Sequence, residues 1–133
     1  MTFAQLDRDA LRRGMTVAAA ITLPAAVVSW LTDRGSERSG PAGLLTVVVV
    51  FGLLLGGFAA ASQQRLNAPL THSLVAVLAV VGLLQVVRIV RLALLGRPLN
   101  LPASLGNVLL GLVTSVAAGL LAGQKSGKRQ ADN

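Results

Sequence analysis

Long apolar stretches alternate with short polar segments along the whole chain. Four stretches are apolar on every face, unlike the single stripe of an amphipathic helix or the alternation of a half-buried strand. A helix needs about 20 mainly apolar residues to cross a bilayer. We place the spans at residues 14–32, 44–62, 70–90 and 103–122. The pattern predicts an all-α fold, an integral membrane four-helix bundle of two helical hairpins, with residues 1–133 as a single transmembrane domain.

The two ends of the chain differ in character. The first span follows Arg12 and Arg13, and Trp30 lies near its far end, where an amphipathic ring prefers the membrane interface. A cleaved signal peptide would also have a basic start before an apolar region, and would leave three spans. The apolar stretch continues to Leu31 before charge follows, which favours a retained anchor. Residues 124–133 are polar, and we expect a flexible tail.

The basic residues predict the orientation of the chain. There are 12 Lys and Arg against 5 Asp and Glu, a net charge of +7. The basic residues lie at the ends of apolar runs rather than in a stripe with aromatics, which favours membrane anchoring and argues against nucleic acid as a partner. With the N-terminus inside, seven of the 12 lie on the cytoplasmic side: Arg8, Arg12, Arg13, Arg65, Lys125, Lys128 and Arg129. We therefore expect a multi-pass protein of the cell inner (plasma) membrane with both termini cytoplasmic.

Small residues recur every four positions in two of the spans. They are Gly52, Gly56 and Ala60 in the second span, and Gly111, Ser115, Gly119 and Gly123 in the fourth. Lipid chains are as apolar as leucine, so helices in a bilayer associate through close packing and polar contacts. These seven residues are therefore predicted helix-packing positions. Their partner helices could belong to the same chain, to a second copy in a homo-oligomer, or to another membrane protein.

Three polar residues at helical spacing end the third span. Gln85, Arg88 and Arg91 lie on one side of a helix, and a charge in hydrocarbon is costly. If the helix continues to Leu95, Arg88 would face a partner carboxylate, an anionic lipid head group or a polar cavity. In the favoured alternative, the membrane part ends near residue 87, and residues 88–97 form an amphipathic interfacial turn whose arginines reach lipid phosphates. The three residues are candidate lipid or pore contacts, and the expected partners are the bilayer and anionic lipids.

A short motif resembles one group of known proteins. Residues 56–61 read Gly-Gly-Phe-Ala-Ala-Ala, and after a short loop residues 71–74 read Thr-His-Ser-Leu. This resembles small four-span bacterial membrane proteins of unknown function, in which a glycine stands where this chain has Ser73. The Ala-, Val- and Arg-rich composition looks actinobacterial. The resemblance implies the four-span architecture and no site residues.

The chemistry that the chain lacks narrows its function. It has no cysteine, no serine nucleophile with a matching His and Asp, no cluster of metal ligands and no phosphate-binding loop. We expect no catalytic residue, metal or cofactor, and no enzymatic activity. The favoured function is a non-catalytic accessory or scaffold subunit of a membrane complex. The alternative is a small oligomeric channel or transporter with an arginine-lined path, although transport normally needs ionisable residues near the midplane.

Overall fold

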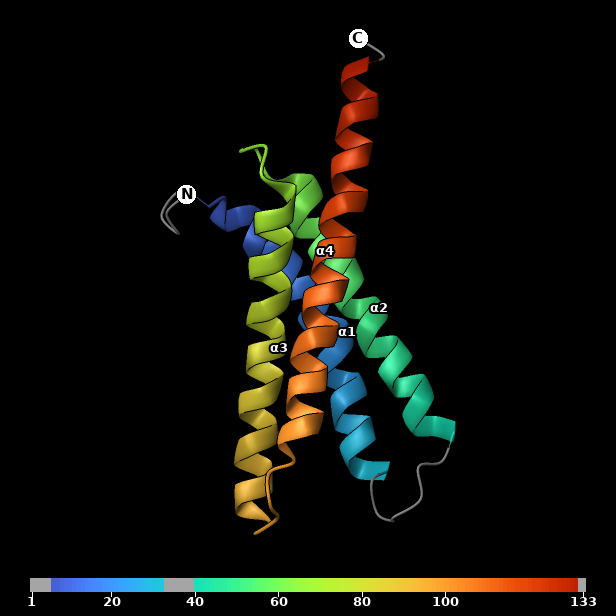
Figure 1. Ribbon diagram of the computed structural model, residues 1–133, viewed down its shortest axis with the longest axis vertical. Helices are drawn as coiled ribbons and strands as arrows, with labels where there is room; N and C mark the ends of the chain where they lie inside the picture. Colours follow the sequence, from blue (N-terminus) through green and yellow to red (C-terminus); the bar gives the residue numbers. More distant parts are fainter. Residues whose placement is uncertain (1–5, 33–39, 132–133) are drawn as a thin grey trace.

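The computed structural model describes residues 6–32 and 40–131, which form four helices and no strand (Figure 1). The helices are α1 (Arg8–Thr32), α2 (Gly40–Gln63), α3 (Pro69–Leu94) and α4 (Leu101–Ala131). All four are long and apolar enough to cross a membrane. The prediction of an all-helical chain with four long apolar helices is confirmed.

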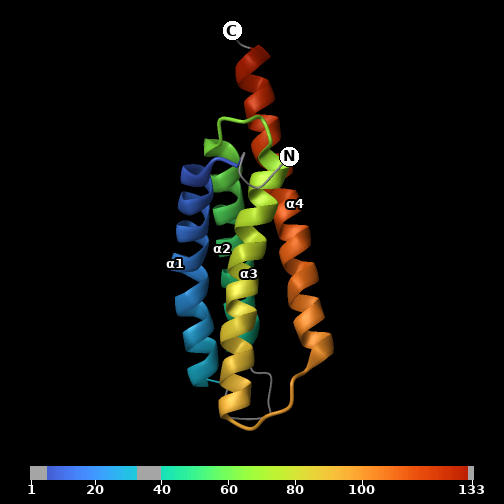
Figure 2. The same ribbon diagram turned by 90° about the vertical axis from the view of Figure 1, so that its left-hand side faces the viewer.

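The helices run side by side along one long axis, with both ends of the chain at the same end of the bundle (Figures 1 and 2). α1 packs most extensively on α2, and α3 packs extensively on α4, so the bundle consists of two hairpins. α2 and α3 each contact all three other helices, whereas the described parts of α1 and α4 do not touch. α2 and α3 therefore form the middle of the bundle, and α1 and α4 flank them.

The closest approach of two helices is between α1 and α2. A methyl group added at Gly14 would lie 2.7 Å from the carbonyl oxygen of Gly56, and one added at Gly52 would lie 2.8 Å from Cγ2 of Ile21. Ala18 and Ala60 are fully buried at the same contact. The small-residue face of α2 thus lies against a matching small face of α1, which the sequence analysis did not identify.

The small-residue face of α4 lies against α3. A methyl group on Gly111 would lie 2.8 Å from Cγ2 of Val81, and one on Gly119 would lie 2.9 Å from Cα of Leu70. Gly123 is near Pro69, and the carbonyl oxygen of Ser115 accepts a buried hydrogen bond of 2.7 Å from the hydroxyl of Ser73. Both faces singled out in the sequence therefore have partners within the same chain.

Two helices extend beyond the residues expected from hydropathy. α3 continues without a break to Leu94, so residues 88–94 are helical rather than a separate interfacial turn. It ends because Gly96 adopts φ +62°, while Gly96 N–H donates to Ala93 and Arg97 N–H donates to Leu92, as in a Schellman motif. α4 continues to Ala131, so the segment expected to be a flexible tail is helical through that residue. Its Gln, Lys, Arg and Ala residues are good helix formers that hydropathy alone does not detect.

The contact between α1 and α2 predicts which glycine tolerates a side chain. We expect Gly56→Leu to destabilise the bundle by about 1–3 kcal/mol, because the new side chain must push the backbone of α1 away. Gly82→Leu is the matched control, since nothing lies within 4 Å of a methyl group at that position. The control should be neutral or slightly stabilising because leucine favours helix over glycine. Helix content followed during unfolding in detergent measures both, and equal losses would refute the close contact.

Candidate functional site

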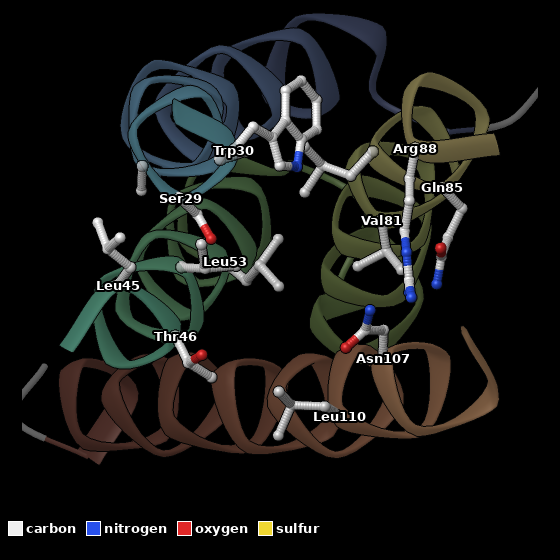
Figure 3. A pocket seen from close by; sticks show the side chains of 14 residues that line it. Ser29, Trp30, Leu45, Thr46, Leu53, Val81, Gln85, Arg88, Asn107 and Leu110 are labelled. Atoms are coloured by element: carbon white, nitrogen blue, oxygen red, sulfur yellow. The ribbon is translucent and has the colours of Figure 1, made fainter. Parts of the chain in front are cut away.

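The described residues line a partly open cavity of about 200 Å³ between the two hairpins. It lies in the half of the bundle away from the chain ends, and all four helices contribute to its wall (Figure 3). Its apolar wall includes Ala25, Leu45, Val49, Leu53, Val81, Leu84 and Leu110, and its polar wall includes Ser29, Trp30, Thr46, Gln85, Arg88 and Asn107. The cavity therefore combines a mostly aliphatic surface with a few polar groups.

Two of the three predicted polar residues hold helices together. The side-chain amide of Gln85 donates to the carbonyl oxygen of Ser104 at 3.0 Å, which joins α3 to α4. The guanidinium of Arg91 donates to the carbonyl oxygen of Trp30 at 3.2 Å and lies 5.5 Å from the centre of the Trp30 ring, which joins α3 to α1. Both side chains therefore form hydrogen bonds between helices.

Arg88 differs from its two neighbours. Its side chain is partly buried and extends along the cavity toward Asn107 (Figure 3). Within the described part of the chain, no carbonyl or carboxylate hydrogen-bonds to this guanidinium. The carboxylates described there are Asp7 and Asp9, which lie near the start of α1, at the opposite end of the bundle. The positive charge of Arg88 therefore faces the cavity without a counter-charge from these helices.

A second polar cluster lies at the end of the bundle that holds the chain termini. His72 is fully buried; its Nε2 accepts the backbone N–H of Asp7 at 3.0 Å, and its Nδ1 lies 2.8 Å from the carbonyl oxygen of Ala68. These two contacts fit a neutral imidazole with its proton on Nδ1. The sequence places His72 in the first turn of the third span. In the structure, its hydrogen bond with Asp7 joins the start of α1 to α3.

Asp7 completes this cluster and caps α1. Its Oδ1 accepts the backbone N–H groups of Ala10 and Asp9, both at 3.2 Å, and its Oδ2 accepts the N–H of Arg65 at 3.3 Å. The Ala10 N–H, followed by the Arg65 and Asp9 N–H groups and the Arg65 charge, lowers the pKa of the Asp7 carboxyl below its ordinary value. Sequence reasoning missed Asp7, although an aspartate just before a helix is a known capping signal.

The remaining observations do not point to a known activity. Among the residues that the structure describes, no group of three His, Cys, Asp or Glu side chains could hold a metal ion. No known protein family, curated protein or solved structure matches this chain. The resemblance to small four-span bacterial proteins therefore stays a prediction, and the candidate site is the cavity with Arg88.

The different surroundings of the two arginines predict opposite effects on stability. We expect Arg91→Gln to destabilise the bundle by about 1 kcal/mol, because it removes a charged hydrogen bond and the contact with the Trp30 ring. Arg88→Gln should be neutral or slightly stabilising, since it removes a partly buried charge that has no partner among the described helices. Unfolding of both variants in the same detergent measures the difference, and a larger loss for Arg88→Gln would contradict these contacts.

The cap at Asp7 predicts how stability depends on pH. The pKa of Asp7 is lower in the folded chain than its ordinary value of 3.8, so its contribution to stability is present above about pH 4. That contribution is lost as the pH falls through the lower folded value, because the carboxyl then binds a proton. We expect Asp7→Asn to be less stable than the wild type at pH 6, with the difference shrinking toward pH 3. A constant difference across this range, measured by unfolding in detergent, would rule out the carboxylate cap.

Proposed function

We propose that this chain is a non-catalytic accessory or scaffold subunit of a membrane complex, in the cell inner (plasma) membrane, with both termini cytoplasmic. The four long apolar helices support a multi-pass arrangement. The excess of Lys and Arg at the end of the bundle that holds the termini supports the orientation, because cytoplasmic segments are enriched in these residues.

The observation that carries the proposal is the packed core beside the cavity. Ala18, Val77 and Ala118 are fully buried in the half of the bundle near the chain termini. The cavity is bounded by Leu53 and Val81 and does not include these core residues. A water-filled conduit through a single chain would need open space along its length. Here buried aliphatic side chains fill the path, and the buried hydroxyls of Thr22, Ser73 and Ser115 donate to backbone carbonyl oxygens.

The size of the cavity also favours an accessory role. Sites for drug-sized molecules usually measure about 300–1,000 Å³, and this cavity is about 200 Å³. It is therefore small for an organic solute carried across a membrane. The outward faces of the helices instead present large aliphatic side chains suited to lipid or to a larger membrane protein, on α4 Leu101, Leu105, Leu109, Val113, Val116 and Leu120.

A channel or transporter is the second candidate function, and one observation favours it. Arg88 and Asn107 both line the cavity, so several copies of the chain could assemble an arginine-lined path. In that arrangement the path would run between the helical hairpins of the assembled copies, rather than through the packed core of any one copy. This alternative makes a different prediction about which positions water reaches.

Cysteine accessibility separates the two functions, because the chain has no native cysteine. Single cysteines at positions 77, 81, 85, 88, 92 and 95 would be treated with a membrane-impermeant thiol reagent on intact cells. We expect labelling at 95 that declines through the cavity positions 88, 85 and 81 and is absent at 77, where the core is packed. Labelling that continues at helical period to 77 would contradict the accessory role and favour a hydrated path.

Two controls complete this experiment. A cysteine at Gly82, on the open face of α3, should stay unlabelled because it faces lipid. A cysteine at Gly127, on the exposed last turns of α4, should be labelled only after the cells are permeabilised. Labelling of Gly127→Cys on intact cells would show that the termini face outward, opposite to the proposed orientation. A separate experiment tests for a partner: a photo-crosslinking residue replaces Val113 on the exposed face of α4, and the crosslinked chain is purified in mild detergent. A second protein crosslinked in stoichiometric amount would support the subunit role. Crosslinking of the chain only to copies of itself would count against it.

A further inference from the structure

We infer that the cavity binds one anionic membrane lipid, with the lipid phosphate at Arg88 and part of one acyl chain against the apolar wall. This goes beyond the accessory role, although it rests on the bilayer placement proposed above. Arg88 carries a guanidinium that is partly buried and lacks a counter-charge among the described helices, and such a charge is costly in an apolar setting. An anion supplied from outside the chain would remove that cost.

The positions of the polar groups favour a phosphate. Figure 3 shows the guanidinium of Arg88 and the amide of Asn107 pointing toward the same space between α3 and α4. A guanidinium presents several N–H donors in a planar fork that matches phosphate oxygens, and an amide adds further donors. Gln85 and Arg91 each donate to a carbonyl oxygen of a neighbouring helix, whereas the guanidinium of Arg88 has no acceptor among the described residues.

The rest of the cavity suits an acyl chain. Leu53, Val81, Leu84 and Leu110 form an aliphatic wall that continues from the polar groups into the bundle. The volume of about 200 Å³ is about seven times the share of one water molecule in the liquid. The cavity can accept a segment of an acyl chain but not a whole lipid molecule. A lipid whose remaining atoms stay in the bilayer meets this limit, because only part of it must enter.

The length of α3 places Arg88 at a suitable depth. The helix has 26 residues, which is about 39 Å at 1.5 Å per residue. This exceeds a hydrocarbon core of about 30 Å by about 9 Å. Arg88 lies six residues before the last residue of α3, which is also about 9 Å along the axis. If Pro69 marks one boundary of the hydrocarbon, Arg88 lies at the other, where lipid phosphates begin.

The chain carries its own reporter for this site. Trp30 is its single tryptophan and lines the cavity. Bromine atoms on an acyl chain quench tryptophan fluorescence at short range, so a brominated lipid in the cavity would dim Trp30. The chain would be reconstituted in phosphatidylcholine vesicles containing a small fraction of brominated phosphatidylglycerol or, in parallel, brominated phosphatidylcholine. The ratio of the two quenching efficiencies measures the preference for the anionic lipid.

We expect the wild type to prefer the anionic lipid about fivefold, as one basic residue near the surface provides. Arg88→Gln should reduce the preference to about onefold, and Arg88→Lys should keep part of it. Arg97→Gln is the matched control, because it removes the same charge from the exposed α3–α4 loop and should keep the preference nearly unchanged. Helix content and unfolding of Arg88→Gln in detergent show that the variant is folded.

Each other outcome would overturn the inference. Equal losses in Arg88→Gln and Arg97→Gln would show general surface attraction, and equal quenching by both lipids in the wild type would show ordinary lipid contact. Loss of the preference on adding glycerol phosphate to the buffer would show a site for a free anion. Asp33 and Glu37 lie in residues 33–39, outside the described residues; a preference that appears only in Asp33→Asn/Glu37→Gln would show that they neutralise Arg88. Quenching by neither lipid would also refute the bilayer placement, whereas quenching by both leaves that placement supported.

Discussion

The close approach of α1 and α2 is the constraint on which the rest of the bundle depends. Helices in lipid gain little by hiding apolar surface from one another, so their attraction comes from close packing over a long contact. Gly14 and Gly56 allow the two backbones to meet, because neither carries a methyl group that would separate them. Toward the interhelical loops the facing side chains become larger, including Trp30, Leu45 and Leu84, and α2 separates from the other helices there (Figure 1). The cavity lies where this packing of small residues gives way to large ones.

The number and type of the helices could be predicted from the sequence, because apolar length is a local property of the chain. The small faces of α2 and α4 could also be predicted, since their four-residue spacing is visible in the letters. Their partners could not, because Gly14 and Ala18 form a shorter pattern whose meaning depends on the crossing of α1 over α2. α3 and α4 extend beyond the predicted apolar spans for a related reason. Hydropathy falls before the helix ends, and hydrogen bonding at Gly96 determines the end of α3.

The three polar residues of α3 share one sequence spacing but have different contacts in the structure. Gln85, Arg88 and Arg91 are three residues apart and look equivalent in the sequence. In the structure, Gln85 reaches α4 and Arg91 reaches α1, while Arg88 lies between them and faces the cavity. Each role is determined by which carbonyl group or ring lies opposite, and those partners are distant in the sequence. The sequence pattern located the site. Only the tertiary structure shows that two of its residues join helices, whereas the third has no hydrogen-bond partner among the described residues.

The polar groups at the two ends of the bundle differ in how many hydrogen-bond partners the described chain gives them. At the end with the termini, the carboxylate of Asp7 accepts three backbone N–H groups and the imidazole of His72 has a contact at each nitrogen. The polar groups of this cluster therefore have hydrogen-bond partners within the described chain. At the other end, Arg88 faces a mostly aliphatic cavity, and no carboxylate of the described residues lies near its charge. Satisfied polar groups are typical of positions that stabilise a fold, whereas an uncompensated local cost is typical of positions retained for function. Within residues 6–32 and 40–131, the polar groups of the cluster at Asp7 and His72 have partners in the chain and Arg88 has none, and the proposed anionic lipid would supply that missing partner.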